Sequence, residues 1–281
     1  MRSGFVDANG LRFGYLEEGA GPLVLLVHGF PDSPFTWDRA LPALAEAGFR
    51  AVAPFTRGYA PTAIPADGAY DTDTLGKDLL ALIGALGADA ATVVGHDWGA
   101  SAAYAAAAMA PSRVRLLVTL GIPHPRAIKP TPALLWKVRH FATLRRKGAA
   151  ERIRRGDFAL VDELWRRWSP SWRDLPPAET EAAKEVLREP GCLEAALGYY
   201  RAMTLRLPAS HRLPIAVPAV AFAGEHDDII TPRAYEKARR CFTASYEVVQ
   251  VPGGHFMHRE HPEPFLCDLV RIVREHAPRP R

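Results

Sequence analysis

Residues 95–99, Gly-His-Asp-Trp-Gly, form the segment whose residue types most clearly indicate chemistry. An apolar stretch, residues 91–94, precedes it, and a run of small residues typical of a helix follows it. A Gly-x-nucleophile-x-Gly sequence between a strand and a helix forms a sharp turn, which presents its central side chain beside the amides of the helix N-terminus. Glycines suit this turn because bulky side chains would clash there. The pattern predicts that Asp97 is a nucleophile.

The central residue of this turn is an aspartate rather than a serine, and this changes the class of reaction. A carboxylate, with a reference pKa near 3.9, is already ionised at neutral pH and needs no base in order to attack. Attack on an acyl carbon would give a high-energy anhydride, whereas attack on a saturated carbon that bears a leaving oxygen or halide gives an ordinary ester. Catalysis would then proceed by alkylation of Asp97 followed by hydrolysis of the ester. The alternative without chemistry is that Asp97 only caps the next helix.

Hydrolysis of such an ester needs a base, and His255 is the candidate. It lies in residues 251–256, Val-Pro-Gly-Gly-His-Phe, which follow the last predicted strand in a setting suited to a catalytic imidazole. An acid to orient this histidine is expected after an earlier strand, where Asp227 and Asp228 follow residues 221–224. We favour Asp227 over Asp228. The chain order is then nucleophile, acid and histidine, as in enzymes with this kind of turn.

An oxyanion hole is expected from two backbone amides. Residues 28–31, His-Gly-Phe-Pro, follow the apolar strand of residues 23–27, and in this position the amide of Phe30 can point at the nucleophile. Together with the amide of Trp98 it would stabilise the tetrahedral intermediate of ester hydrolysis. The simpler alternative is a turn that merely ends the strand.

These segments together resemble the α/β-hydrolase-fold epoxide hydrolases, well over residues 22–128 and 218–262 and weakly between them. The segments that carry the resemblance are residues 28–31, Arg57-Gly-Tyr-Ala-Pro-Thr62, residues 95–99, and those around Asp227 and His255. The resemblance implies that Asp97 attacks an epoxide carbon and that His255, with Asp227, activates water. It also implies a cis peptide bond between Phe30 and Pro31.

Members of this family usually carry two tyrosines in a helical lid, which donate hydrogen bonds to the opening epoxide oxygen. Residues 197–203, Leu-Gly-Tyr-Tyr-Arg-Ala-Met, resemble the segment with the second tyrosine, which makes Tyr200 the candidate and Tyr199 the fallback. The first tyrosine is absent, because residues 136–144 contain none. His140 falls nearest to its place, and an imidazole N–H can also donate a hydrogen bond. The alternative is that His140 is an ordinary surface residue.

Three other functions stay open. A haloalkane dehalogenase would share the aspartate and would need N–H donors for the halide, from Trp98 and from an indole among the lid residues Trp136, Trp165, Trp168 and Trp172. Another hydrolase of the same fold is a further alternative. A non-catalytic binding protein on this fold is a remote one, because Asp97, Asp227 and His255 are all present.

The elements that must position these residues alternate along the chain. Continuous apolar runs recur at residues 23–27, 49–55, 91–95, 114–120, 219–223 and 246–251, and residues 5–17 read as a hairpin around Asn9-Gly10. Continuous rather than alternating apolar runs predict a mostly parallel sheet that is buried on both faces, with helices such as 73–86 and 100–109 between the strands. The prediction is an α/β-hydrolase core of residues 1–124 and 214–281, with an inserted helical lid over residues 125–213.

Composition and charge limit the partners. The 281 residues are 48% hydrophobic and 23% charged, typical of a globular chain, and the net charge of +4 is too small by itself to imply a nucleic-acid or membrane partner. Residues 129–173 hold 12 cations and 4 acids, which we interpret as a solvated helix surface, the alternative being a surface that binds anions or nucleic acid. We expect no nucleic-acid and no membrane partner. We expect a cytoplasmic monomer or homodimer that acts on a small molecule without metal or organic cofactor. The three dispersed cysteines, the absence of an apolar leader and apolar runs too short for a bilayer support this expectation.

Overall fold

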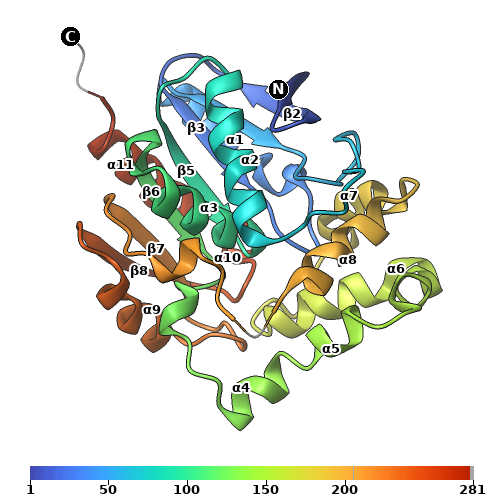
Figure 1. Ribbon diagram of the computed structural model, residues 1–281. Helices are drawn as coiled ribbons and strands as arrows, with labels where there is room; N and C mark the ends of the chain where they lie inside the picture. Colours follow the sequence, from blue (N-terminus) through green and yellow to red (C-terminus); the bar gives the residue numbers. More distant parts are fainter. Residues whose placement is uncertain (205, 279–281) are drawn as a thin grey trace.

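The computed structural model describes residues 1–204 and 206–278, and its centre is an eight-stranded sheet (Figure 1). The strand order is β1-β2-β4-β3-β5-β6-β7-β8. Strands β3 to β8 pair in parallel, whereas β1 pairs antiparallel with β2, and β2 antiparallel with β4. The strands are β1 Arg2–Ala8, β2 Leu11–Glu18, β3 Leu23–Val27, β4 Arg50–Pro54, β5 Ala91–His96, β6 Val114–Leu120, β7 Ala219–Gly224 and β8 Tyr246–Val251.

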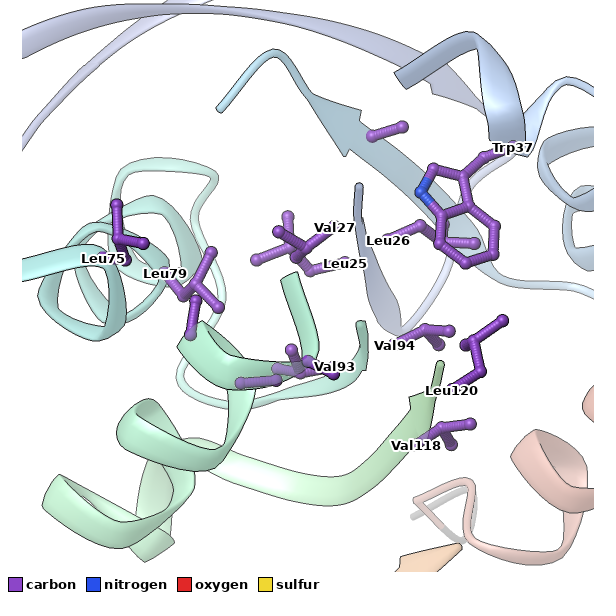
Figure 2. Packing of buried hydrophobic residues seen from close by; sticks show 14 of the residues in the cluster. Leu25, Leu26, Val27, Trp37, Leu75, Leu79, Val93, Val94, Val118 and Leu120 are labelled. Atoms are coloured by element: carbon purple, nitrogen blue, oxygen red, sulfur yellow. The ribbon is translucent and has the colours of Figure 1, made fainter. Parts of the chain in front are cut away.

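The central strands β3, β5 and β6 are buried along almost their whole length because both faces of the sheet are covered. Leu26 and Val94 lie on the side of Trp37, whereas Leu25 and Val93 lie on the opposite face, the side of α2 (Figure 2). All four side chains are fully buried. The predicted parallel sheet and the hairpin at Asn9-Gly10 are confirmed.

Helices cover the two faces in two groups. Helices α2 (Thr72–Ala85) and α3 (Trp98–Met109) pack against each other, and α1 (Ala40–Glu46) packs against α11 (Pro262–Glu275). Helices α9 (Pro232–Ala238) and α10 (Met257–Glu260) complete the second half of the chain. Helix α3 begins two residues earlier than predicted, directly after Asp97. Asp97 is therefore the single residue between β5 and α3.

Among the described residues, five α-helices follow β6 and precede β7, within the predicted lid of residues 125–213, and lie beyond one end of the sheet (Figure 1). They are α4 Pro132–Lys137, α5 His140–Leu144, α6 Ala149–Trp168, α7 Pro177–Arg188 and α8 Cys192–Ala202. Helix α6 is interrupted at residues 155–158, where the backbone dihedrals are not helical. The division of the chain at residues 125 and 213 stays a prediction.

The lid helices are tied to the core by specific contacts. The indole of Trp165 on α6 donates a hydrogen bond of 2.9 Å to the carbonyl of Pro31 and stacks on Phe256 with ring centroids 3.8 Å apart. The hydroxyl of Tyr199 on α8 donates to the carbonyl of Arg57 at 2.8 Å.

Among residues 1–204 and 206–278, no helix is both long and apolar enough to cross a membrane.

Candidate active site

Asp97 sits at the turn between β5 and α3 in a strained backbone conformation, with φ 52° and ψ −116°. Positive φ is uncommon for a residue other than glycine and is characteristic of a nucleophile turn. The flanking glycines make this turn possible, because a Cβ on Gly99 would lie 2.1 Å from the carbonyl oxygen of Val27, and one on Gly95 would lie 2.4 Å from that of Gly99. The two glycines therefore allow a tight turn that places the Asp97 carboxylate at the C-terminal end of β5.

His255 and Asp227 lie beside this carboxylate. Nε2 of His255 is 3.6 Å from Oδ2 of Asp97, and its Nδ1 is 3.3 Å from Oδ2 of Asp227. The other oxygen of Asp227 accepts hydrogen bonds from the amides of Ile229 and Ile230, at 2.7 and 3.1 Å, which fixes the carboxylate. Asp228, the alternative acid, points elsewhere: its side chain is 55% exposed and pairs with Lys137.

Electrostatics make Asp97 and His255 an ion pair. Burial alone would raise the pKa of Asp97, but the nearby His255, the His96 ring and the Phe30 amide hold that pKa below its ordinary value. Burial alone would lower the pKa of His255, but Asp227 and Asp97 raise it to about 9. At neutral pH the carboxylate is ionised, while the imidazole is held as a cation by its two acidic neighbours.

The loop after β3 supplies a backbone donor to the same carboxylate. The amide of Phe30 donates a hydrogen bond of 3.0 Å to Oδ1 of Asp97. Gly29 allows this approach, because a Cβ there would lie 2.5 Å from Oδ1 of Asp97 and 2.8 Å from the amide nitrogen of Trp98. The Phe30–Pro31 peptide bond is cis, which confirms the expectation from the resemblance, and Ala60–Pro61 is cis as well.

A cavity of about 290 Å³ opens between this end of the sheet and the lid. Asp97 and His255 line it from the core, and His140, Trp168 and Tyr200 line it from α5, α6 and α8. The rest of the lining is apolar: Ile122, Pro125, Ile128, Pro130, Leu134, Leu135, Val138, Phe141, Met203, Ile229 and Ile230. Such a cavity accepts a small apolar molecule and presents it to a few polar groups.

Tyr200, and not the fallback Tyr199, faces this cavity. The hydroxyl of Tyr199 is occupied by its hydrogen bond to the carbonyl of Arg57. Tyr200 packs edge-to-face between Phe30 and Trp98, with ring centroids 5.3 Å away in each case. Burial and the charge of Asp97 raise the pKa of Tyr200 well above its ordinary value, so its O–H stays protonated and is a hydrogen-bond donor.

His140 is buried rather than exposed, with its ring centroid 4.9 Å from that of Trp168. Burial, with a contribution from the charge of Arg167, lowers the pKa of His140 to about 4. The imidazole is therefore neutral at neutral pH and carries one N–H donor. The alternative that His140 is a surface residue does not hold.

Of the four lid tryptophans, Trp168 is the one that lines the cavity together with Asp97. Trp165 spends its indole N–H on Pro31, and Trp136 is 68% exposed. Trp98, at the start of α3, turns its ring toward Tyr199 and Tyr200. An indole donor facing the substrate would therefore come from Trp168.

The loop that carries His255 is held by the lid. The amide of His255 donates to the carbonyl of Trp168 at 2.9 Å, and the amide of Phe256 donates to the hydroxyl of Ser169 at 3.0 Å. Gly254 permits this contact, because a Cβ there would lie 2.4 Å from Cα of Ser169. Gly254 thus serves a close backbone approach between two segments that are distant in the sequence.

Three buried residues behind His255 escaped the sequence analysis. Asp32, His96 and His258 each direct one potential ligand atom to a common point, and these atoms lie within 4.8 Å of one another. Nε2 of His96 is 3.0 Å from the carbonyl oxygen of His255, and Nε2 of His258 is 2.7 Å from the hydroxyl of Thr36. Their contacts go to neighbouring loops, and we assign them to support of the His255 loop. They come from the loop after β3, the last position of β5 and helix α10, so no sequence spacing could have joined them.

A sequence profile described as alpha/beta hydrolase fold matches residues 22–262. "Epoxide hydrolase A" of Mycobacterium tuberculosis is 30% identical to this chain over 313 residues, covering 95% of this chain and 96% of that protein. An "Epoxide hydrolase" of Caballeronia sordidicola is 46% identical over 120 residues, which are 42% of this chain and only 36% of the relative.

Solved structures agree with these relatives. An epoxide hydrolase from Vigna radiata superimposes with a TM-score of 0.82 at 25% identity, over 98% of each chain. One from Bacillus megaterium gives a TM-score of 0.85 over 96% of this chain and 100% of that one, and at 22% identity it supports the fold alone. The chain belongs to the alpha/beta hydrolase fold family, among the epoxide hydrolases, and is a hydrolase.

Proposed function

We propose that this protein hydrolyses an epoxide through a covalent ester on Asp97, which water then cleaves. The observation that carries the proposal is that three kinds of group surround the carboxylate of Asp97: a backbone amide, an imidazole and a tyrosine hydroxyl. Oδ1 of Asp97 is held by the Phe30 amide at 3.0 Å, Oδ2 lies 3.6 Å from His255, and the hydroxyl-bearing Tyr200 lines the same apolar cavity. The names of the relatives are consistent with it.

In the first half-reaction Oδ2 of Asp97 attacks a ring carbon, and the bond from that carbon to the epoxide oxygen breaks. The oxygen becomes an alkoxide, which must accept a hydrogen bond or a proton as it forms. Tyr200 is the donor that we assign, with the neutral imidazole of His140 as the second. Oδ1, already bonded to the Phe30 amide, becomes the carbonyl oxygen of the ester.

In the second half-reaction water attacks Cγ of the ester. His255 accepts the proton from this water, and Asp227 stabilises the resulting imidazolium. The amides of Phe30 and Trp98 are assigned to the oxyanion that forms on Oδ1. The alkoxide of the first half-reaction takes up the proton that the resting imidazolium carried, so His255 is neutral when it accepts the proton of the water. When the intermediate collapses, the bond from Cγ to the diol oxygen breaks, and this oxygen takes a proton from the imidazolium as the diol leaves. The Asp97 carboxyl then gives its proton to His255, which restores the resting carboxylate and imidazolium, and every step uses side chains or backbone amides of this chain, without metal or organic cofactor.

Replacing Tyr200 by phenylalanine tests this function against its nearest alternative. We expect Y200F to slow the opening of an epoxide such as styrene oxide by about 10²- to 10³-fold, because one donor to the developing alkoxide is lost. Displacement of a halide from a haloalkane needs no hydroxyl donor and would not depend on Tyr200. A panel of epoxides and haloalkanes, assayed with the wild type and Y200F, measures both. Haloalkane turnover by the wild type without epoxide turnover would assign the protein to the dehalogenases instead.

The place of His140 can be tested with two substitutions at the same position. H140F keeps an aromatic ring beside Trp168 but removes the N–H, and we expect it to lower the rate of epoxide opening by about tenfold or more. H140Y restores a donor and should keep most of the activity. Pre-steady-state measurement of ester formation is the appropriate assay. Equal rates for H140F and the wild type would reduce His140 to a packing residue.

The dehalogenase alternative has one specific observation in its favour, which is the indole of Trp168 in the cavity wall beside Asp97. The alternative still lacks a second polar donor in the loop after β3, where Phe30 stands.

We also propose that the protein works in a reducing cytoplasm, an assignment consistent with three free cysteines, two of them buried.

A further inference from the structure

Helix α4 carries the most exposed of the large apolar side chains in the described part of the chain. Trp136 is 68% exposed and Leu135 is 59% exposed, on a six-residue helix that projects from the lower tip of the lid (Figure 1). The guanidinium of Arg139 lies over the Trp136 ring, 4.3 Å from its centroid. Trp136 and Leu135 are consecutive, and both large apolar side chains are exposed to solvent, which is typical of an interaction surface.

The chain around α4 is basic and free of acids. Residues 126–150 contain seven lysines and arginines and not one aspartate or glutamate. Lys137 pairs with Asp228, but among the described residues no salt bridge engages Lys129, Arg139, Arg145, Arg146 or Lys147. These five exposed side chains flank α4 in the sequence and, with Leu135 and Trp136, are called the α4 surface below. Its charge complements an anionic partner.

The α4 surface also borders the entrance to the candidate active site. Leu135 lines the cavity that contains Asp97 and His255, although more than half of its side chain is exposed. The neighbouring Leu134 and Val138 line the same cavity, which is apolar over most of its wall. The opening is therefore framed by residues that are compatible with a hydrocarbon environment.

We propose that the α4 surface binds the surface of an anionic lipid bilayer. Tryptophan is favoured at the boundary between headgroups and acyl chains, where its ring is partly apolar and its N–H is wet. Lysines and arginines beside such a residue are attracted by anionic headgroups. The arrangement places the mouth of an apolar cavity against the phase in which apolar molecules dissolve. The expectation of no membrane partner rests on the small net charge of the whole chain and on apolar runs too short to span a bilayer. Neither observation bears on a local basic surface that contacts a bilayer from one side.

The test is sedimentation of the full-length protein with vesicles of phosphatidylcholine, alone or mixed with phosphatidylglycerol. We expect binding to the mixed vesicles, little binding to the neutral ones, and weakening at high salt, since the Debye length falls from about 10 Å at 0.1 M to about 3 Å at 1 M. The double variant L135A/W136A should lower the partition coefficient by about tenfold or more, and R145E/R146E should lower it on anionic vesicles alone.

Matched controls come from other parts of the molecule. Phe5 on β1 is 50% exposed and has Arg12 over its ring at 4.6 Å, so F5A removes a comparable aromatic group from outside the α4 surface. K77E/R274E reverses two exposed charges on α2 and α11. Neither control should change vesicle binding. The proposal is overturned if the wild type does not bind anionic vesicles, if the controls lose binding equally, or if binding ignores lipid charge. Concentration-dependent self-association that L135A/W136A abolishes, without vesicle binding, would assign the surface to a second copy of the chain.

Discussion

Asp97→Asn is expected to abolish turnover, with a fall in kcat of at least about 10⁴-fold, equivalent to about 5 kcal/mol of transition-state stabilisation. The amide is nearly the same size as the carboxylate, so the turn after β5 keeps its shape. It carries no negative charge and is a poor nucleophile at saturated carbon. The loss should therefore appear in the formation of the ester and not in substrate binding. The affinity for an unreactive substrate analogue, measured for the variant and for the wild type, checks the second point.

The control for this variant is its chemical integrity. Asparagine in a strained turn beside a histidine can hydrolyse back to aspartate, so the intact mass of freshly purified protein should be verified before each assay. Wild-type turnover by a preparation that is fully asparagine by mass would refute nucleophilic attack by Asp97. It would leave this residue as a helix cap.

His255→Gln is expected to separate the two half-reactions. Nε2 of His255 lies 3.6 Å from Asp97, and once Asp97 is alkylated it no longer carries the charge that helps to hold the imidazole protonated. The neutral imidazole can then act as a base, which glutamine cannot do. We expect H255Q to form the ester in a single stoichiometric burst and to hydrolyse it about 10²- to 10⁴-fold more slowly.

Mass spectrometry reads this outcome directly. The peptide that contains Asp97 should gain the mass of the intact epoxide, and the gain should persist in H255Q but vanish rapidly in the wild type. The double variant D97N/H255Q is the control and should show no gain. A label on any other peptide would place the nucleophile elsewhere, and normal steady-state turnover by H255Q would remove His255 from the mechanism.

The sequence predicts the fold well where burial alone decides it. Strands β3, β6 and β8 begin and end as expected, because continuous apolar runs end where the chain leaves the interior. The lid is less predictable. Periodicity predicts its helices, but the interruption of α6 at residues 155–158 has no breaker stronger than Gly156, so the sequence alone does not locate it.

The site follows the same division. Asp97, Asp227 and His255 lie in motifs with local signatures, and the structure brings them within contact distance. The choice between Asp227 and Asp228, or between Tyr200 and Tyr199, depends on which side chain turns inward. That is settled by remote partners, Lys137 for Asp228 and Arg57 for Tyr199. Trp168 lies in no motif, because its place beside Asp97 is defined only by tertiary contacts.

The attachment of the His255 loop to the end of α6 has a consequence for the order of events. The amides of His255 and Phe256 donate hydrogen bonds to Trp168 and Ser169, so an outward movement of the lid would move His255 as well. Under the proposed mechanism, His255 would therefore activate water only while the lid is closed, and an enzyme that had opened to release its diol would be unable to cleave an ester. The lid and the proposed base would move together, because the same two hydrogen bonds join them.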